Sequence, residues 1–276
     1  MKKILVPIDF SANSKNALKY ALKVAEMNHA KVSVLYVYSL FSGAPERIVG
    51  QAKLDMVDPA VKAYNDVKDL IKKVNAGGKI KTEILIKDGI PEVVIIETAK
   101  KMKAGLVVIG RTGNSAIQRF FIGSTVANVL KQSDIPVLVI PAGTKWKKIK
   151  RVVFTTDLSN QTLKHAGEAA AFARYFDAEL VFLYIDTGSV LTSDQKVFEM
   201  TEKLKKKVKY KNVSGFICED ITVREGIDYY FTHFKADMVV MVSHHYSFPQ
   251  LIWKRSLTRR LSAAFNIPLL ALVEKK

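Results

Sequence analysis

The chain has 276 residues, of which 49% are hydrophobic and 25% charged, and its formal net charge is +17 at pH 7. This is nearly twice a typical domain of about 150 residues, so we expect two globular domains. The single cysteine, Cys218, excludes an internal disulfide and a zinc site made of several thiolates. No apolar run approaches the roughly 18 residues of a membrane span, and the first apolar segment is too short for a secretory signal. We therefore expect the chain to stay in the cytoplasm.

Short runs of Val, Ile and Leu alternate with helical patterns along the first half of the chain. We expect strands over 3–8, 32–38, 81–86, 106–109 and 136–140, and helices after Ser11 and over 51–74, 91–101 and 125–131. Ser11 is a typical N-cap for the first helix. The apolar stripe of that helix consists of Ala17, Leu18, Ala21, Leu22 and Ala25. Continuous apolar strands, each followed by a helix, indicate an α/β fold with a parallel sheet covered on both faces.

The same order of elements restarts in the second half, which indicates an internal repeat. In an ungapped alignment at an offset of 148 residues, seven positions between residues 9 and 36 are identical in the two halves: Asp9, Ser11, Ala21, Ala25, Ala30, Leu35 and Tyr36. Further along, Gly89-Ile90 matches Gly226-Ile227, although the second copy is shorter in its middle. We expect tandem domains over 1–143 and 151–276. The linker between them, 144–150, is short enough to keep the two halves packed as neighbours.

The residues that point to chemistry follow the fourth expected strand. Gly110-Arg111-Thr112-Gly113 comes directly after it, and Gly123-Ser124-Thr125 opens the next helix. Glycines permit positive φ and close backbone approach, and a helix N-terminus offers unpaired N–H groups to an anion. If the strand order is 3-2-1-4-5, the Pro7-Ile8-Asp9 segment faces this loop where the order reverses. The spacing fits neither a P-loop nor the dinucleotide fingerprint, but it indicates a phosphate site.

These segments resemble the universal stress protein family. The resemblance rests on Val6-Pro7-Ile8-Asp9, Gly89-Ile90-Pro91, the G-x2-G-x9-G-S/T pattern at Gly110, Gly113, Gly123 and Ser124, and the 135–139 segment. It implies two tandem doubly wound, five-stranded parallel-sheet domains of strand order 3-2-1-4-5. The first would bind ATP or AMP, with Mg²⁺ on the phosphates left open. The domains would pair through their last strands, and a homodimer is also left open.

The resemblance also implies the nucleotide-binding residues. Pro7, Asp9 and Val37 would contact adenine and ribose. The residues that would hold ribose and phosphates are Gly110, Gly113, Gly123, Ser124 and Thr125. Arg111 is included with the binding residues, although the family pattern varies at Arg111 and Thr112 and leaves their roles open. Family members typically bind nucleotides in stress responses rather than act as fast enzymes, and no catalytic residue is expected.

The second half departs from this pattern. Val242, His245 and Arg255 replace the three glycines, and Thr155 replaces Pro7, whereas Asp157 and Ser256 match their counterparts. A valine at a position suited to positive φ would be strained, and bulkier side chains would occupy the phosphate space. We therefore expect a degenerate second domain that serves as a structural partner or binds another ligand.

The sequence leaves other functions open. One is slow ATP hydrolysis or adenylate transfer, with Asp9 as a general base, although no orienting partner for Asp9 is visible. Another is a regulatory module that binds a partner protein or a lipid through the segment 39–50, without nucleotide.

Nucleic acid and metal are not expected as ligands. Lysine clusters at 145–150 and 203–211 could follow a phosphate backbone. No series of stacking aromatics accompanies them, and the second cluster ends a helical pattern, where cations complement the macrodipole. His244 and His245 are adjacent on a loop and would point apart, so they do not indicate a metal site.

Overall fold

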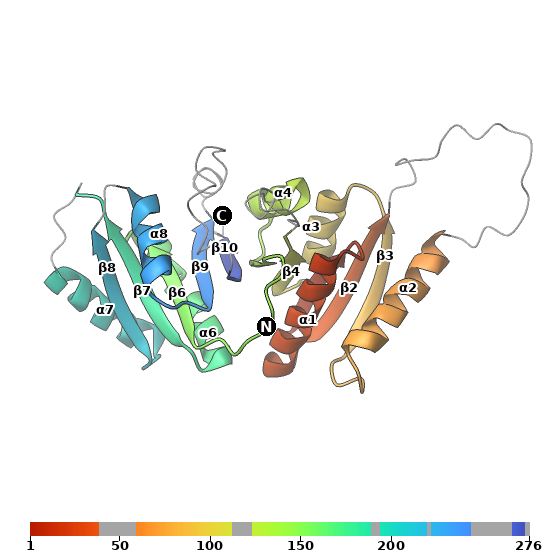
Figure 1. Cartoon of the computed structure of the whole chain (residues 1–276), viewed down its shortest axis with the longest axis horizontal. Helices are drawn as coiled ribbons and strands as arrows, with labels where there is room; N and C mark the ends of the chain where they lie inside the picture. The colour runs from red at the N-terminus through yellow and green to blue at the C-terminus, as the bar shows by residue number, and fades with distance from the viewer. Residues whose placement is uncertain (39–58, 112–122, 189–193, 220–221, 244–266, 274–276) are drawn as a thin grey trace, which may run out of the picture.

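The structure is a computed structural model that describes residues 1–38, 59–111, 123–188, 194–219, 222–243 and 267–273. Within these residues, a 10-stranded sheet has the order β3-β2-β1-β4-β5-β10-β9-β6-β7-β8 (Figure 1). The first-half strands are β1 (Lys3–Ile8), β2 (Lys31–Tyr38), β3 (Thr82–Asp88), β4 (Leu106–Gly110) and β5 (Val137–Ile140). The second-half strands are β6 (Arg151–Thr156), β7 (Glu179–Asp186), β8 (Val213–Glu219), β9 (Met238–Ser243) and β10 (Leu269–Val273).

Helices alternate with these strands along the chain. The first-half helices are α1 (Ala12–Asn28), α2 (Pro59–Val74), α3 (Pro91–Lys101) and α4 (Ser124–Gln132). The second-half helices are α5 (Asn160–Lys164), α6 (Ala166–Phe176), α7 (Asp194–Val208) and α8 (Val223–His233). Among the described helices, none is both long enough and apolar enough to cross a membrane.

The first half confirms the predicted strand order 3-2-1-4-5, and its five strands are parallel to one another. Successive residues of β1 pack into different cores because side chains alternate across a strand. Ile4 and Val6 pack with the buried residues of α1 and α2, whereas Leu5 packs with those of α3 and α4. Burial on both faces is why these strands read as continuous apolar runs.

The second half repeats this topology in the order β10-β9-β6-β7-β8. Buried residues of α6 and α7 join the same core as those of α1 and α2, and buried residues of α8 join the core under α3 and α4. The counterpart of α1 is divided into two helices, α5 and α6. His165 ends α5 and directly precedes the first residue of α6.

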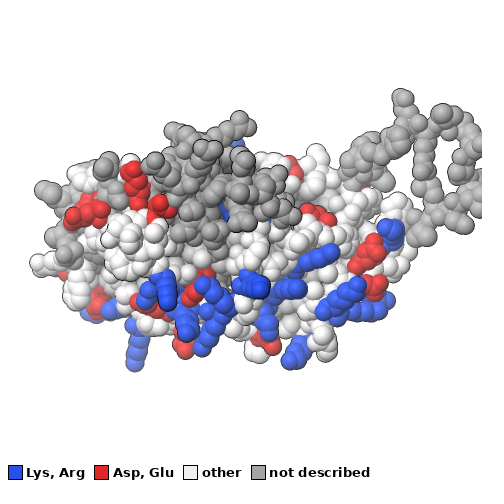
Figure 2. All heavy atoms as spheres, viewed as in Figure 1, with Lys and Arg blue, Asp and Glu red and all other residues white. Residues whose placement is uncertain are grey.

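The two halves meet through their last strands, as the family resemblance implied. β5 and β10 pair antiparallel, with Leu138 opposite Leu270. The segment 144–150 contains no helix or strand, and β6 begins at Arg151. The domain limits 1–143 and 151–276 stay a prediction. Lys and Arg side chains gather along the lower edge of the molecule in Figure 2, the edge at which the chain crosses from one half to the other in Figure 1.

The first-half helices and strands that the structure describes begin and end within about two residues of the predicted bounds. One predicted helix is only partly described, and one predicted match between the two halves is wrong. The prediction of a helix over 51–74 falls partly outside the described residues, which begin again at Pro59. The match of Gly89 to Gly226 is wrong. Gly89, at φ 132°, precedes α3, whereas Gly226 lies inside α8. The helices α3 and α8 correspond at an offset of 132 residues, the offset that also relates β4 to β9.

Candidate functional site

A pocket of about 350 Å³ lies at the carboxyl ends of β1, β2 and β4. It stands where the strand order reverses, which is the usual ligand position in doubly wound sheets. Predicted site residues that line it are Pro7, Asp9, Val37, Gly110, Gly123, Ser124 and Thr125. The structure therefore brings the segment after β1 and the start of α4 together around one cavity.

Arg111 does not line this pocket. Its side chain is only 3% exposed, and its backbone N–H donates to the carbonyl oxygen of Ile140 at 2.9 Å. Burial lowers the pKa of the guanidinium to about 10, so the group stays charged at neutral pH. Thr112 and Gly113 lie outside the described residues.

The pocket wall also contains residues that the sequence did not mark as nucleotide-binding residues. They are Ile8, Ser11, Ser14, Pro91, Ile95, Ile109 and Val126. Ser14 had a recognisable signal, because it stands three residues after the N-cap Ser11, where a cap interacts with the helix. Pro91 belongs to the Gly89-Ile90-Pro91 motif of the family resemblance, whereas Ile95 had no signal, since its place depends on which face of the sheet α3 covers.

Asp9 is held in a tight turn at the end of β1. The turn reverses through Phe10, whose φ is 61°. One carboxylate oxygen of Asp9 accepts the N–H of Ser11 at 3.0 Å, and the N–H of Asp9 donates to the Ser14 hydroxyl at 3.3 Å. Burial tends to raise the pKa of Asp9, but hydrogen bonds from Ser11 and Ser14 outweigh it and lower the pKa below its ordinary value of 3.8. Asp9 is a carboxylate that accepts hydrogen bonds.

The N-terminal ends of three helices contribute to the pocket wall. Ser11 caps α1, Pro91 opens α3, and Gly123 precedes Ser124 at the start of α4. The side chain of Ser11 accepts the N–H of Ser14, whereas α4 has no side-chain cap because its N-cap is a glycine. Because Gly123 supplies no side-chain cap, the first turn of α4 presents backbone donors and the positive end of the helix dipole at the cavity, as far as the described residues show.

Gly110 is required by a close approach of two backbones. A β-carbon at this position would lie 2.5 Å from the carbonyl oxygen of Asn13 and 2.7 Å from its carbonyl carbon. Neither Gly110 nor Gly123 has a positive φ, since Gly123 has φ −58° and Gly110 is not among the described residues with positive φ. Of the two properties of glycine expected here, positive φ is absent at Gly110 and Gly123, whereas close backbone approach is present at Gly110. Gly110 instead lets α1 pack against the end of β4.

The second half keeps the acidic turn. Leu158 has φ 59°, and the Asp157 carboxylate accepts the N–H of Ser159 at 2.9 Å. Thr162 takes the place of Ser14, and its N–H donates to the Ser159 hydroxyl at 3.2 Å. The turn is therefore a property of the repeat and does not by itself make a ligand site.

The second half differs in the walls around that turn. Val242 lies in β9 opposite Leu272 without positive φ, so the expected strain is absent. Ile185, the counterpart of Val37, packs so closely on α8 that a β-carbon at Gly226 would lie 2.5 Å from its Cγ2. Ile185 is buried, whereas Val37 lines the first-half pocket. The counterparts His245, Arg255 and Ser256, and also His244, lie outside the described residues.

The model of the universal stress protein family matches residues 1–141. The chain belongs to the universal stress protein family. Universal stress protein MJ0531 of Methanocaldococcus jannaschii is 34% identical over 146 residues, which cover 50% of this chain and 81% of that protein. Universal stress protein MJ0577 of the same organism is 28% identical over 156 residues, 50% of this chain and 94% of that protein.

The solved structures extend the likeness to the second half. A crystal structure of a universal stress protein from Archaeoglobus fulgidus superposes with a TM-score of 0.72 at 19% identity, covering 99% of this chain and 97% of that one. At this identity the comparison shows the fold alone. Both halves thus have the universal stress protein fold, and the family model recognises the half that carries the pocket.

Proposed function

We propose that the first-half pocket binds an adenine nucleotide, ATP or AMP, and that this universal stress protein is a nucleotide-binding protein of the stress response. The observation that carries the proposal is the convergence of Asp9, Val37 and the start of α4 on one cavity. Asp9 offers a hydrogen-bond acceptor for ribose hydroxyls, Val37 an apolar wall for the base, and the start of α4 an anion site for the phosphates.

The phosphates would bind at the uncapped start of α4. Backbone N–H groups after Gly123 and the hydroxyls of Ser124 and Thr125 are the donors on this side of the cavity. A Mg²⁺ ion would bind the phosphates themselves, because Mg²⁺ commonly takes its ligands from substrate phosphates and water. The base would lie against the apolar side, where Val37, Pro91 and Ile95 line the wall.

The lowered pKa of Asp9 supports a role in binding rather than in hydrolysis. A general base works best with a pKa near the operating pH, which requires a raised carboxylate pKa. Hydrogen bonds instead lower the pKa of Asp9, and they leave the carboxylate as an acceptor for a ribose hydroxyl. We propose a non-catalytic site, and single-turnover assays with labelled ATP test the alternative of slow hydrolysis or adenylate transfer.

We further propose one nucleotide site per chain. Support comes from Ile185, the counterpart of Val37, which is buried and packs closely on α8 and would leave less room for a ligand on that side. The second half would then serve as the internal partner of the first through β5 and β10. The cytoplasmic location stays a prediction.

Mass spectrometry of the small molecules released from the purified, denatured chain tests this function. We expect about one adenine nucleotide per chain, and none from the Gly123→Val variant prepared in parallel. Release of a lipid, or failure of added ATP and AMP to bind in calorimetry, would instead favour a partner- or lipid-binding module.

A further inference from the structure

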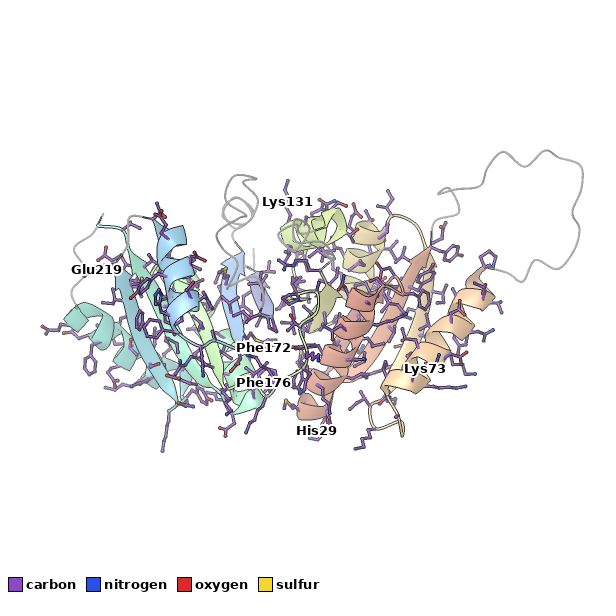
Figure 3. All side chains as sticks on the ribbon, viewed as in Figure 1. His29, Lys73, Lys131, Phe172, Phe176 and Glu219 are labelled. Atoms are coloured by element: carbon purple, nitrogen blue, oxygen red, sulfur yellow. The ribbon has the colours of Figure 1, made fainter. Side chains whose placement is uncertain are left out.

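The linker between the halves is packed between α1 and α6. The ring of Trp146 lies 5.0 Å from that of Tyr20 on α1, edge to face, and 6.3 Å from that of Phe176 on α6. Figure 3 places Phe172 and Phe176 beside the seam between the halves. Ile149, three residues after Trp146, is only 2% exposed. The linker is therefore an integral part of the core at the seam.

Helix α1 holds the start of this linker through two hydrogen bonds. The side-chain amide of Asn16 donates to the carbonyl oxygen of Thr144 at 2.7 Å, and the hydroxyl of Tyr20 donates to that of Lys145 at 2.8 Å. Tyr20 is only 1% exposed. A buried hydroxyl that loses its partner costs about 1–3 kcal/mol, so the position of α1 and that of the linker are tied together.

The second half holds the end of the linker through Asp237. Its carboxylate accepts the N–H of Lys150 at 2.8 Å and that of Arg151 at 3.1 Å, and it pairs with the Lys147 ammonium at 2.7 Å. The linker is thus fixed to α1 at one end and to the segment before β9 at the other. A displacement of α1 relative to the second half must change these contacts or the packing of Trp146.

The same helix carries part of the pocket wall. Ser11 and Ser14 line the cavity, and Asn13 lies against Gly110. Tyr20 stands about 9 Å further along the axis than Ser14, at the 1.5 Å rise per residue of an α-helix. The helix is continuous over this distance, so a displacement of its ligand-facing turn would be carried to its linker-facing turn.

We propose that α1 couples occupancy of the pocket to the linker, so that a bound nucleotide alters the packing of Trp146 against the second half. The inference rests on the proposed nucleotide site and adds the route by which binding reaches the rest of the chain. Coupling between two sites typically changes affinity by fivefold or more, and we expect loosening of the linker contacts to weaken binding to at least this extent.

The first test uses the emission of Trp146 in a Trp253→Phe background, because the chain has 2 tryptophans. Saturating ATP shifts this emission, and Tyr20→Phe in the same background reduces the shift and weakens ATP binding at least fivefold. Tyr210→Phe is the matched control, since it removes a tyrosine hydroxyl that donates to a backbone carbonyl within the second half. ATP that binds by calorimetry without changing Trp146 emission, with Tyr20→Phe affinity within twofold of the parent, overturns the coupling.

The second test needs no nucleotide. In the ligand-free chain, Trp146→Ala and Tyr20→Phe both accelerate hydrogen exchange of the Ser14 amide in the first turn of α1 at least fivefold. Phe198→Ala, at a side chain 67% exposed on α7, leaves that exchange unchanged. Equal exchange in all these proteins overturns the coupling, whereas failure of ATP to bind overturns only the proposed function.

Discussion

A β-carbon on Gly110 would lie 2.5 Å from the carbonyl oxygen of Asn13. Because backbone atoms stand on both sides of this contact, Gly110→Ala forces α1 away from the end of β4. We expect a loss of about 1–3 kcal/mol in the free energy of unfolding, the usual cost of overpacking, together with weaker ATP binding. Urea denaturation and calorimetry measure the two effects.

The matched control is Gly167→Ala in α6. A β-carbon there meets no atom within 4 Å, and the glycine is helical. This variant is expected to gain about 0.5–1 kcal/mol from the better helix propensity of alanine. Equal stabilities of the two variants would show that the close approach at Gly110 has no energetic weight.

Gly123→Val tests the phosphate end of the pocket. Gly123 has φ −58° and ψ 153°, a backbone conformation that valine adopts without strain. The fold should therefore lose little stability, while the added side chain at the start of α4 blocks the phosphates. We expect no measurable ATP binding in calorimetry and a free energy of unfolding within about 1 kcal/mol of the parent. An unchanged affinity would remove α4 from the site.

Asp9 and Asp157 provide a matched pair for stoichiometry. Each carboxylate accepts the N–H two residues later, so their removal costs the turns similar hydrogen bonds. Titration with ATP should saturate near one molecule per chain, and Asp9→Ala should weaken binding while Asp157→Ala does not. Two equivalent sites, or loss of binding only in the Asp157 variant, would place the working pocket in the other half.

The acid side of the stability profile depends on these turns. Burial tends to raise the pKa of Asp157, but hydrogen bonds from Thr162 and Ser159 lower it overall below 3.8. A lowered pKa adds stability that is complete above 3.8 and is lost as the pH falls through the folded value. The stability difference between the wild type and Asp157→Asn should therefore be full at neutral pH and shrink below 3.8. Urea denaturation at neutral pH and below pH 3.8 measures this difference. A difference that grows on acidification would contradict the lowered pKa of Asp157.

The net charge of +17 is not expected to support binding to nucleic acid. Within the linker cluster, Lys147 is already paired with Asp237 at 2.7 Å. We expect weak duplex DNA binding at low salt that becomes negligible at physiological salt, because such contacts depend on counterion release. Fluorescence anisotropy across a salt series provides the measurement. Sub-micromolar affinity at physiological salt would reverse this interpretation.

Most helices and strands could be predicted because the patterns that mark them lie among neighbouring residues. The Ser11 cap, the apolar run of β1 and the span of α3 were all readable from neighbouring residues, and the structure confirms them. The strand order followed from the resemblance to a family. Gly226 was misaligned because a glycine can serve either a turn or a close helix–strand approach, and the sequence does not distinguish the two.

The site was predicted less completely because it is built across elements. Asp9 and Gly123 follow strand ends or begin helices, so their spacing marked them. Ile95 reaches the cavity only because α3 lies on one particular face of the sheet, which no local pattern encodes. Arg111 sits in the predicted loop, yet it is buried and absent from the pocket wall.

The antiparallel contact of β5 with β10 joins two parts of one chain. A seam between separate chains opens on dilution, because association depends on protein concentration. Here the covalent connection keeps the partner strand at a fixed, high local concentration, so the seam should stay closed even at nanomolar protein. Each half also has the same partner throughout its lifetime, and the two copies can therefore diverge in their ligand sites without forming mixed pairs.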